Sequence, residues 1–217
     1  MQIDWDIVRE SIPLLAEGLV VTLQVSALSA VLGLFLGVVF GLGALSRNRF
    51  VRWLVAAYVD FIRGTPLLIQ IFLVFFALPM IGLRFDEFWA GVVALSLNAA
   101  AFVAEVVRGG VGSIEKGQSE AAQSIGMRHR QILVYILLPQ AYRQMIPPLT
   151  NEMISLVKNS SLLSVISVYE LTRAGQAIIS VHFVPFEIYT LLALYYYILI
   201  KALSWLSVRI ERRLPSW

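Results

Sequence analysis

An apolar segment without any ionisable side chain is the feature that most restricts how this chain folds. No charged residue occurs between Glu17 and Arg47. The run over residues 19–45 is long enough to cross a hydrocarbon layer that is about 30 Å thick. Because water cannot satisfy backbone polar groups inside such a layer, the segment must be helical. The sequence therefore predicts a first membrane-spanning helix here.

The composition extends this prediction to the whole chain. Hydrophobic residues make up 59% of the 217 residues and charged residues only 14%, compared with about 25% charged residues in soluble domains. At about 20 residues for each span, the length predicts about five helices. We therefore expect an all-α integral membrane protein, with residues 1–217 forming a single transmembrane domain and no separate catalytic domain.

Four further segments predict the remaining spans, and only a short turn separates the first two of them. The predicted helices cover residues 66–80, 88–107, 132–157 and 188–208. Residues 47–63 are expected to form a polar connection. Pro139, Pro147 and Pro148 interrupt the fourth segment, which predicts a kinked or discontinuous helix. Residues 158–187 are expected to form a partly buried loop that contains a short helix.

Small residues recur at a helical spacing in the first span. They are Ser29, Gly33, Gly37 and Gly41. Side chains four positions apart lie on one face of a helix, and small residues on that face allow another helix to approach closely. This pattern predicts helix packing and says little about function.

The distribution of basic residues predicts the orientation. We expect five spans with the amino terminus outside and the carboxyl terminus in the cytoplasm. In this orientation most of the 17 Lys and Arg are cytoplasmic, and the only ones outside are Arg9, Arg84, Lys158 and Arg173. The first residues are mainly acidic, so the basic region of a cleaved signal peptide is not expected. The basic residues that give the net charge of +3 are distributed as membrane orientation requires, so no nucleic-acid partner is expected. The chain has no cysteine, which excludes disulfides and thiolate metal sites.

The longest polar segment, residues 109–130, then begins a cytoplasmic stretch that reaches residue 139 and contains a spaced motif. Glu120, Ala121 and Ala122 are followed after three residues by Gly126, and after nine more by Ile-x-Leu-Pro, which ends at Pro139. This resembles the cytoplasmic EAA signature of permease subunits of bacterial ATP-binding-cassette (ABC) importers. Residues 18–23, 63–70, 94–108, 116–126 and 151–163 resemble the polar amino acid subgroup of that family.

The resemblance implies the fold, the function and the partners. It implies a type I importer permease in the bacterial inner membrane that translocates polar amino acids. The implied partners are separate ATPase subunits, an extracytoplasmic amino acid binding protein, and membrane lipid. The chain would hold no cofactor of its own, since ATP and Mg²⁺ would be bound by the ATPase. Five helices are too few to enclose a path, so a second permease, either an identical or a homologous chain, is also expected.

The local sequence suits a role in coupling to the ATPase. Residues 119–125 predict two helical turns with Ala121, Ala122 and Ile125 as a small apolar face. Glu120 lies in the first turn, where the helix dipole favours an acidic group. Gly126 is able to adopt the left-handed conformation that ends a helix. We expect Glu120, Ala121, Ala122, Ile125, Gly126 and Pro139 to form the coupling element.

Polar residues within the predicted spans are the candidates for a solute pathway, because such groups are costly in a bilayer. Glu152 is the strongest candidate, and Asn151, Ser155 and Asn98 are expected to line a polar cavity with it. A carboxylate can pair with the ammonium group of an amino acid, but it can equally form a structural ion pair. Glu105 and Arg108 are expected to pair within one helix. 

Two other classes of function are less consistent with the sequence, and Arg63 has more than one candidate role. An ion-coupled secondary transporter is expected to contain an internal repeat, which is not visible here. A membrane-embedded enzyme is expected to contain paired histidines, clustered aspartates or a nucleophile turn, and the spans show none of these. No G-x-x-x-x-G-K-[ST] phosphate loop occurs in the chain, so any ATPase must be another polypeptide. Arg63 is a candidate for binding lipid, capping a partner helix or adjoining a gate.

Overall fold

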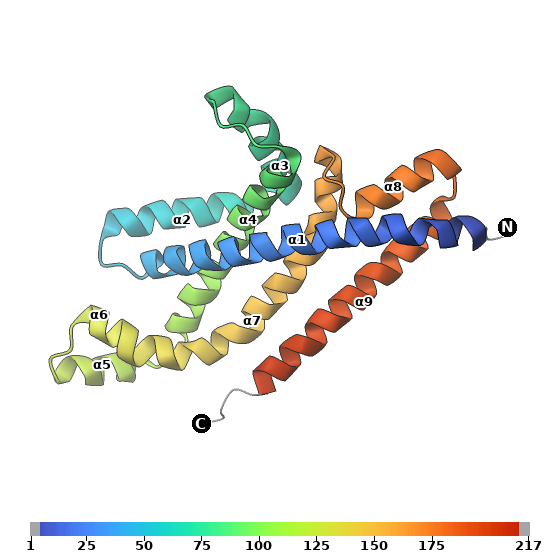
Figure 1. Ribbon diagram of the computed structural model, residues 1–217. Coiled ribbons are helices and arrows are strands. Elements are labelled where there is room, and N and C mark those ends of the chain that lie inside the picture. Colours follow the sequence, from blue (N-terminus) through green and yellow to red (C-terminus); the bar gives the residue numbers. More distant parts are fainter. Residues whose placement is uncertain (1–4, 213–217) are drawn as a thin grey trace.

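Helix α1 is the longest helix of the described residues, and several other helices pack against it. The computed structural model describes residues 5–212, which fold into helices and their connections without a strand. Helix α1 spans Trp5–Ala44 and runs along the length of the molecule (Figure 1). It begins well before the predicted start at residue 19 and contains Pro13. The predicted start of this span therefore lies within a longer helix.

Helix α4, Glu87–Gly112, packs against α1 through the stripe of small residues. An added Cβ at Gly33 would lie 2.8 Å from the Cβ of Ala99, and one at Gly37 would lie 2.4 Å from the Cβ of Val103. Contacts therefore advance by four residues along both helices in the same direction, so α1 and α4 are parallel. The packing role predicted for this stripe is confirmed.

Residues 49–64 form a helix where the sequence predicted a connection. Helix α2, Arg49–Gly64, buries Val55, Val59 and Ile62 on one face and exposes its polar face. Because its hydrophobic residues follow a helical period, its polar residues indicate amphipathicity and not a loop. The prediction of a connection was wrong for this reason. Helix α3, Leu67–Phe72, follows at an angle of 110° to α2 and continues through η1, Leu73–Ala77, and η2, Leu78–Ile81.

Two short helices and a long one follow α4. They are α5, Lys116–Ser124, α6, His129–Ile132, and α7, Leu138–Asn159, with the π-helical η3, Leu133–Leu137, before α7. Helix α7 continues through Pro147 and Pro148, so the helix is not discontinuous at that pair. The irregularity instead precedes Pro139. In a regular helix its ring would collide with the carbonyl four residues earlier, at Tyr135, and a π-helical turn widens the backbone there.

The carboxyl-terminal part is anchored by a buried carboxylate. It contains η4, Ser160–Ile166, α8, Leu171–His182, and α9, Pro185–Arg212. Helix α8 is the short helix predicted within residues 158–187. Glu170 is fully buried and accepts hydrogen bonds from the backbone N–H groups of Thr172 and Arg173 and from the Tyr196 hydroxyl. Glu170 thus caps α8 and ties it to α9.

Several helices are long and apolar enough to cross a membrane. Within the described residues these are α1, α4 and residues 185–209 of α9, and the bent pair of α2 with α3–η2 makes a fourth. Helix α7, the fourth predicted span, is not among them. Its polar residues, which include Arg143, Glu152 and Lys158, lower its hydropathy. The five predicted spans therefore comprise four supported by length and composition and one, α7, that is too polar to be counted with them.

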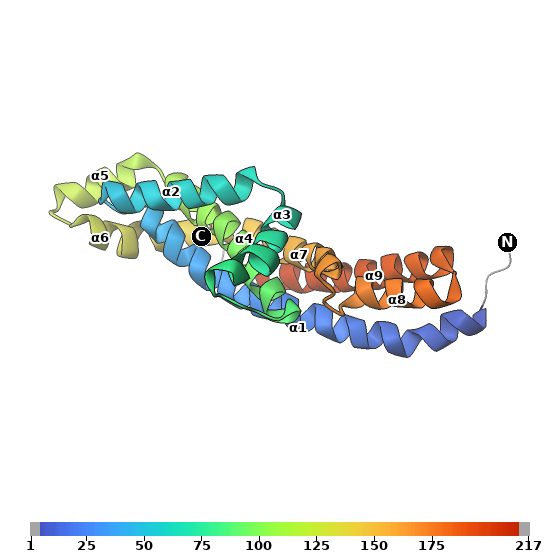
Figure 2. The same cartoon turned by 90° about the horizontal axis from the view of Figure 1, so that it is seen from above.

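The ends of the molecule differ in their elements. Figures 1 and 2 both place α5 and α6 near the junction of α1 and α2, whereas α8 lies at the opposite end. Helix α7 packs against α4 in the reverse direction, since Met145 faces Gly110 and Leu163, just beyond α7, faces Gly91. The chain thus brings the predicted cytoplasmic segment to one end and the segment with α8 to the other.

We expect Gly37→Ala to destabilise the protein, because the new methyl group overlaps Val103 and the carbonyl oxygen of Ala100, 2.9 Å away. Overpacking of this kind costs about 1–3 kcal/mol. Gly112→Ala is the matched control, since nothing lies within 4 Å of its added Cβ. Thermal unfolding of the purified chain in detergent, followed by tryptophan fluorescence, measures both. Equal midpoints for the two variants would contradict the close α1–α4 contact.

Candidate functional site

Most of the predicted coupling element forms the short helix α5 and the turn that ends it, at one end of the molecule. Helix α5 ends in a complete Schellman motif: the N–H of Gly126 donates to the carbonyl of Gln123, and that of Met127 donates to the carbonyl of Ala122. Gly126 has φ of +82°, the left-handed conformation predicted for it. A residue without Cβ is favoured at this position. The backbone, and not a side-chain contact, therefore requires glycine.

The apolar face predicted for this element is divided. Ala122 is only 5% exposed, since α5 packs against η3, the segment that leads into α7. Glu120 and Ala121 are exposed, and Ile125 is 78% exposed. Pro139 is exposed in the first turn of α7. Ala122 thus attaches α5 to its own chain, while Glu120, Ala121 and Ile125 form an outward surface.

Three of the four predicted pathway residues line one cavity. The cavity has a volume of about 540 Å³ and lies between α4, α7 and the end of α2. Asn151, Glu152 and Ser155 line it from successive turns of α7. In a helix, residues that are three or four positions apart lie on the same face. The sequence spacing of Asn151, Glu152 and Ser155 therefore explains why they share a wall.

Asn98 does not line this cavity. It is 7% exposed, and its Nδ2 donates to Gln70 Oε1 at 2.9 Å. Gln70 Nε2 in turn donates to the carbonyls of Ile62, at 2.7 Å, and Thr65, at 3.1 Å. This chain of bonds satisfies carbonyl groups that the end of α2 leaves free. Asn98 and Gln70 therefore hold the bend between α2 and α3.

Sequence reasoning did not single out Gln70 as a structural residue. Its signal was an amide within the apolar run that follows Pro66. A buried amide needs hydrogen-bond partners, and a helix end supplies unpaired carbonyls. That combination could have placed Gln70 near the predicted start of the second span.

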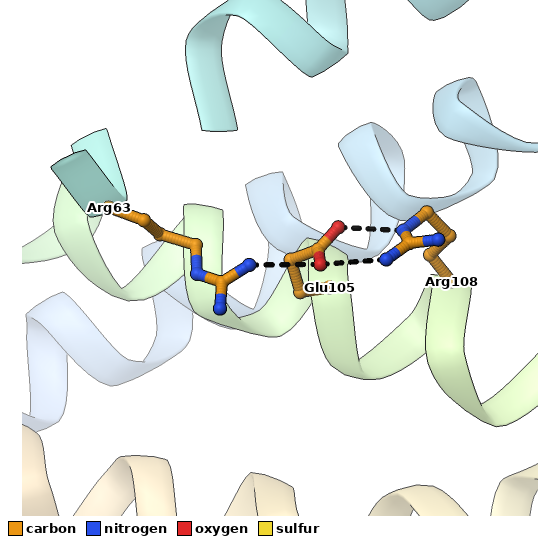
Figure 3. Close-up of polar contacts among 3 residues, drawn as sticks. All are labelled: Arg63, Glu105 and Arg108. Carbon is orange, nitrogen blue, oxygen red and sulfur yellow. Dashed lines mark hydrogen bonds and ion pairs between the residues drawn. The ribbon is translucent and has the colours of Figure 1, made fainter. Parts of the chain in front are cut away.

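A charge cluster lies beside the cavity (Figure 3). Arg108 donates from Nε to Glu105 Oε1 at 2.7 Å and from Nη2 to Oε2 at 2.9 Å, which confirms the predicted pair. Arg63 Nη1 donates to the same Oε2 at 2.9 Å from the end of α2. The guanidinium of Arg63 also lies 5.6 Å from the centre of the Phe102 ring. Sequence reasoning missed the contact of Arg63 because 42 positions separate it from Glu105.

A second cavity, of about 940 Å³, lies on the other side of this cluster. Arg63, Phe102 and Glu105 line both cavities, whereas Asp60 and Arg108 line only the larger one. The cluster thus separates two hollows along the faces of α2 and α4. Among residues 5–212 no three His, Asp or Glu side chains are grouped as metal ligands.

These features together define a membrane permease. Several helices are long and apolar enough to cross a membrane, polar side chains line a cavity between α2, α4 and α7, and a short ordered helix lies at one end of the molecule. The chain belongs to the family described as the binding-protein-dependent transport system inner membrane component, whose profile matches residues 33–215. It is therefore an inner-membrane protein, and the family resemblance found in the sequence is confirmed.

Curated relatives match over the full length of the chain. The arginine transport system permease protein ArtQ of Bacillus subtilis (strain 168) is 38% identical, over 100% of this chain and 99% of the relative. The glutamine transport system permease protein GlnP of Escherichia coli (strain K12) is 40% identical over 99% of both. The L-cystine transport system permease protein TcyB of Bacillus subtilis (strain 168) is 41% identical over 99% of this chain and 93% of the relative.

Solved structures share the fold. A crystal structure of an amino acid ABC transporter with histidines has a TM-score of 0.92 and 36% identity, covering 99% of this chain and 100% of that one. The MetNI methionine ABC transporter in an inward-facing conformation has a TM-score of 0.78 at 22% identity, covering 94% of this chain and 98% of that one. The second likeness concerns the fold alone. The predicted type I importer permease architecture is thus confirmed.

Proposed function

We propose that this chain is the permease subunit of an ATP-driven importer that carries a polar amino acid across the inner membrane. The observation that carries the proposal is the cavity of about 540 Å³ that Glu152 lines between α4 and α7. The relatives named for arginine, glutamine and cystine transport support an amino acid as the solute. A carboxylate and neighbouring amide and hydroxyl groups suit the ammonium and side-chain polar groups of such a solute.

We infer the orientation from the basic residues at one end of the molecule. The amino terminus is outside and the carboxyl terminus is cytoplasmic. Arg47, Arg49 and Arg52 lie at the junction of α1 and α2, the end where α5 and α6 are found (Figure 1). Basic residues favour the cytoplasmic side. The parallel course of α1 and α4 requires the chain to return across the bundle between them.

Reporter fusions at the two termini test the orientation. A periplasmic alkaline phosphatase reporter is expected to be active only when fused before Trp5. A fluorescent protein that matures in the cytoplasm is expected to be bright only when fused after α9. Activity of the same reporter at both ends would refute an odd number of crossings.

The exposed surface of α5 is the docking site for a separate ATPase. Glu120, Ala121 and Ile125 face outward at the cytoplasmic end, and Ala122 attaches them to η3 and so to α7. Movement of the ATPase would thus be passed through α5 to the helix that carries Glu152. ATP and Mg²⁺ are bound by the ATPase, because the permease sequence contains no phosphate loop.

Gly126→Val is expected to weaken this coupling without preventing membrane insertion. A left-handed backbone costs an ordinary L-residue about 1–2 kcal/mol, and a β-branched side chain is among the least tolerant. Gly126→Asn is the matched control, since asparagine tolerates this conformation better. Both are measured by co-purification of the ATPase and by solute-stimulated ATP hydrolysis. The coupling role is wrong if the valine variant retains both at the level of the asparagine variant.

The complete importer contains further partners. A second permease, either a copy of this chain or a homologue, closes the path beside the cavity. An extracytoplasmic binding protein delivers the solute at the end that carries α8. Lipid surrounds the outer helices, which expose large apolar side chains such as Phe35, Trp53 and Ile198.

Reconstitution of the chain with its ATPase and binding protein in proteoliposomes tests the function. Uptake of L-arginine, L-glutamine and L-cystine is measured with ATP enclosed on the ATPase side, and other amino acids compete. ATP-dependent uptake of at least one polar amino acid is expected. Uptake driven by an ion gradient without ATP would instead support a secondary transporter.

Glu152→Gln is expected to abolish uptake or alter its preference among these amino acids. The amide keeps the shape and hydrogen bonding of the side chain but cannot neutralise an ammonium group. An unpaired charge in a span costs at least about 2.5 kcal/mol, so Glu152 needs a charged partner or water. Glu10→Gln, an exposed position on α1 remote from the cavity, is the control.

The same assay separates a solute role from a structural one. A solute role leaves the assembly of the complex and its basal ATP hydrolysis normal in Glu152→Gln. Loss of stability in detergent, or unchanged uptake kinetics, would remove Glu152 from the pathway.

A further inference from the structure

The cavity that Glu152 lines is also lined by an arginine. Arg63, at the end of α2, and Glu105, on α4, line it together with Glu152 on α7. Arg108 completes the charge cluster but lines only the larger cavity behind it. The smaller cavity is therefore bounded by the carboxylate of Glu152 on α7 and, on other helices, by Arg63 and its partner Glu105.

The cluster carries one positive charge in excess, and the geometry places it on Arg63. Glu105 is held by Arg108 through two hydrogen bonds, one to each carboxylate oxygen. Arg63 adds a single bond, from Nη1 to Oε2. A guanidinium has five N–H donors, so Glu105 engages only a small part of the donor capacity of Arg63. Its side chain is also 45% exposed, which leaves it accessible from the cavity.

Local contacts hold the guanidinium in position. Arg63 lies over the Phe102 ring, and Phe102 itself lines the cavity. The Glu105 contact fixes a second side of the guanidinium (Figure 3). A planar group restrained in this way loses less entropy when it binds a further carboxylate.

We propose that Arg63 binds the α-carboxylate of the amino acid whose ammonium group lies beside Glu152. The inference rests on the proposed function, and it assigns a specificity-determining residue to the same cavity. The two groups provide opposite charges on different walls, which matches a zwitterion. A guanidinium recognises a carboxylate through two parallel hydrogen bonds, which an ammonium group of lysine does not reproduce.

The arrangement has a consequence for solute choice. Every α-amino acid presents the same two charged groups, so Arg63 and Glu152 select the class and leave the side chain free to vary. An α-amide keeps the ammonium group but lacks the negative charge that Arg63 recognises. The site should therefore favour a free amino acid over its α-amide.

Equilibrium binding to the permease–ATPase complex in detergent tests the proposal, with the binding protein omitted so that only the permease site is measured. The probe is whichever radiolabelled amino acid among L-arginine, L-glutamine and L-cystine the reconstituted importer transports, and its α-amide competes. Arg63→Gln is expected to weaken binding of the free amino acid by about tenfold to a hundredfold, the range of a charge-assisted hydrogen bond. Binding of the α-amide should change little.

Arg108→Gln is the matched control. Like Arg63→Gln, it removes one cation that pairs with Glu105. It does not alter a side chain that lines the smaller cavity. This variant should keep the preference for the free amino acid over the α-amide. Equal weakening by both substitutions, with the preference retained, would show that Arg63 only supports Glu105, and would overturn the proposal.

A second variant decides the matter if Arg63→Gln does not assemble. Arg63→Lys keeps the cation but lacks the planar fork, so binding of the free amino acid should weaken severalfold while the α-amide is unaffected. Unchanged affinity for the free amino acid in the lysine variant would overturn the proposal. Failure of the wild-type importer to transport any amino acid would instead refute the proposed function.

Discussion

The close contact between parallel helices α1 and α4 is the constraint on which the other elements depend. Two parallel neighbours require the chain to cross back between them, and only residues 45–86 are available for that return. The return is made by α2, which lies along the pair, and by α3, which turns away at 110°. This brings Arg63, at the end of α2, against α4. Helix α7 then packs on α4 in the reverse direction and completes the cavity.

The features that the sequence predicted well depend on neighbouring residues. The left-handed turn at Gly126 and the pair of Glu105 with Arg108 each involve positions within a few residues of one another. The stripe of small residues on α1 was also predictable, because residues spaced four positions apart lie on one face of a helix. For the candidate site, the grouping of Asn151, Glu152 and Ser155 followed from the same geometry.

What the sequence did not predict depends on how distant segments meet. Arg63 and Glu105 contact each other only because α2 turns back along α4. Asn98 was expected in the cavity, since a polar residue in a span suggests a pathway, but the bend at Gln70 offers it a partner elsewhere. Helix α2 was mistaken for a connection because polar residues on one helix face resemble a loop when the opposite face is not recognised.

The π-helical segments share a position relative to proline that affects how the bundle can move. Leu73–Ala77 precedes Pro79, and Leu133–Leu137 precedes Pro139, so each widened turn contains the carbonyl that the proline ring would strike. A π turn inserts an extra residue, and one residue corresponds to about 100° of helical rotation. The widened turn before Pro139 thus sets the azimuth of α7 relative to α6, which it joins without a break. Pro139 therefore influences the direction in which Glu152 faces, because both belong to α7 and turn with it.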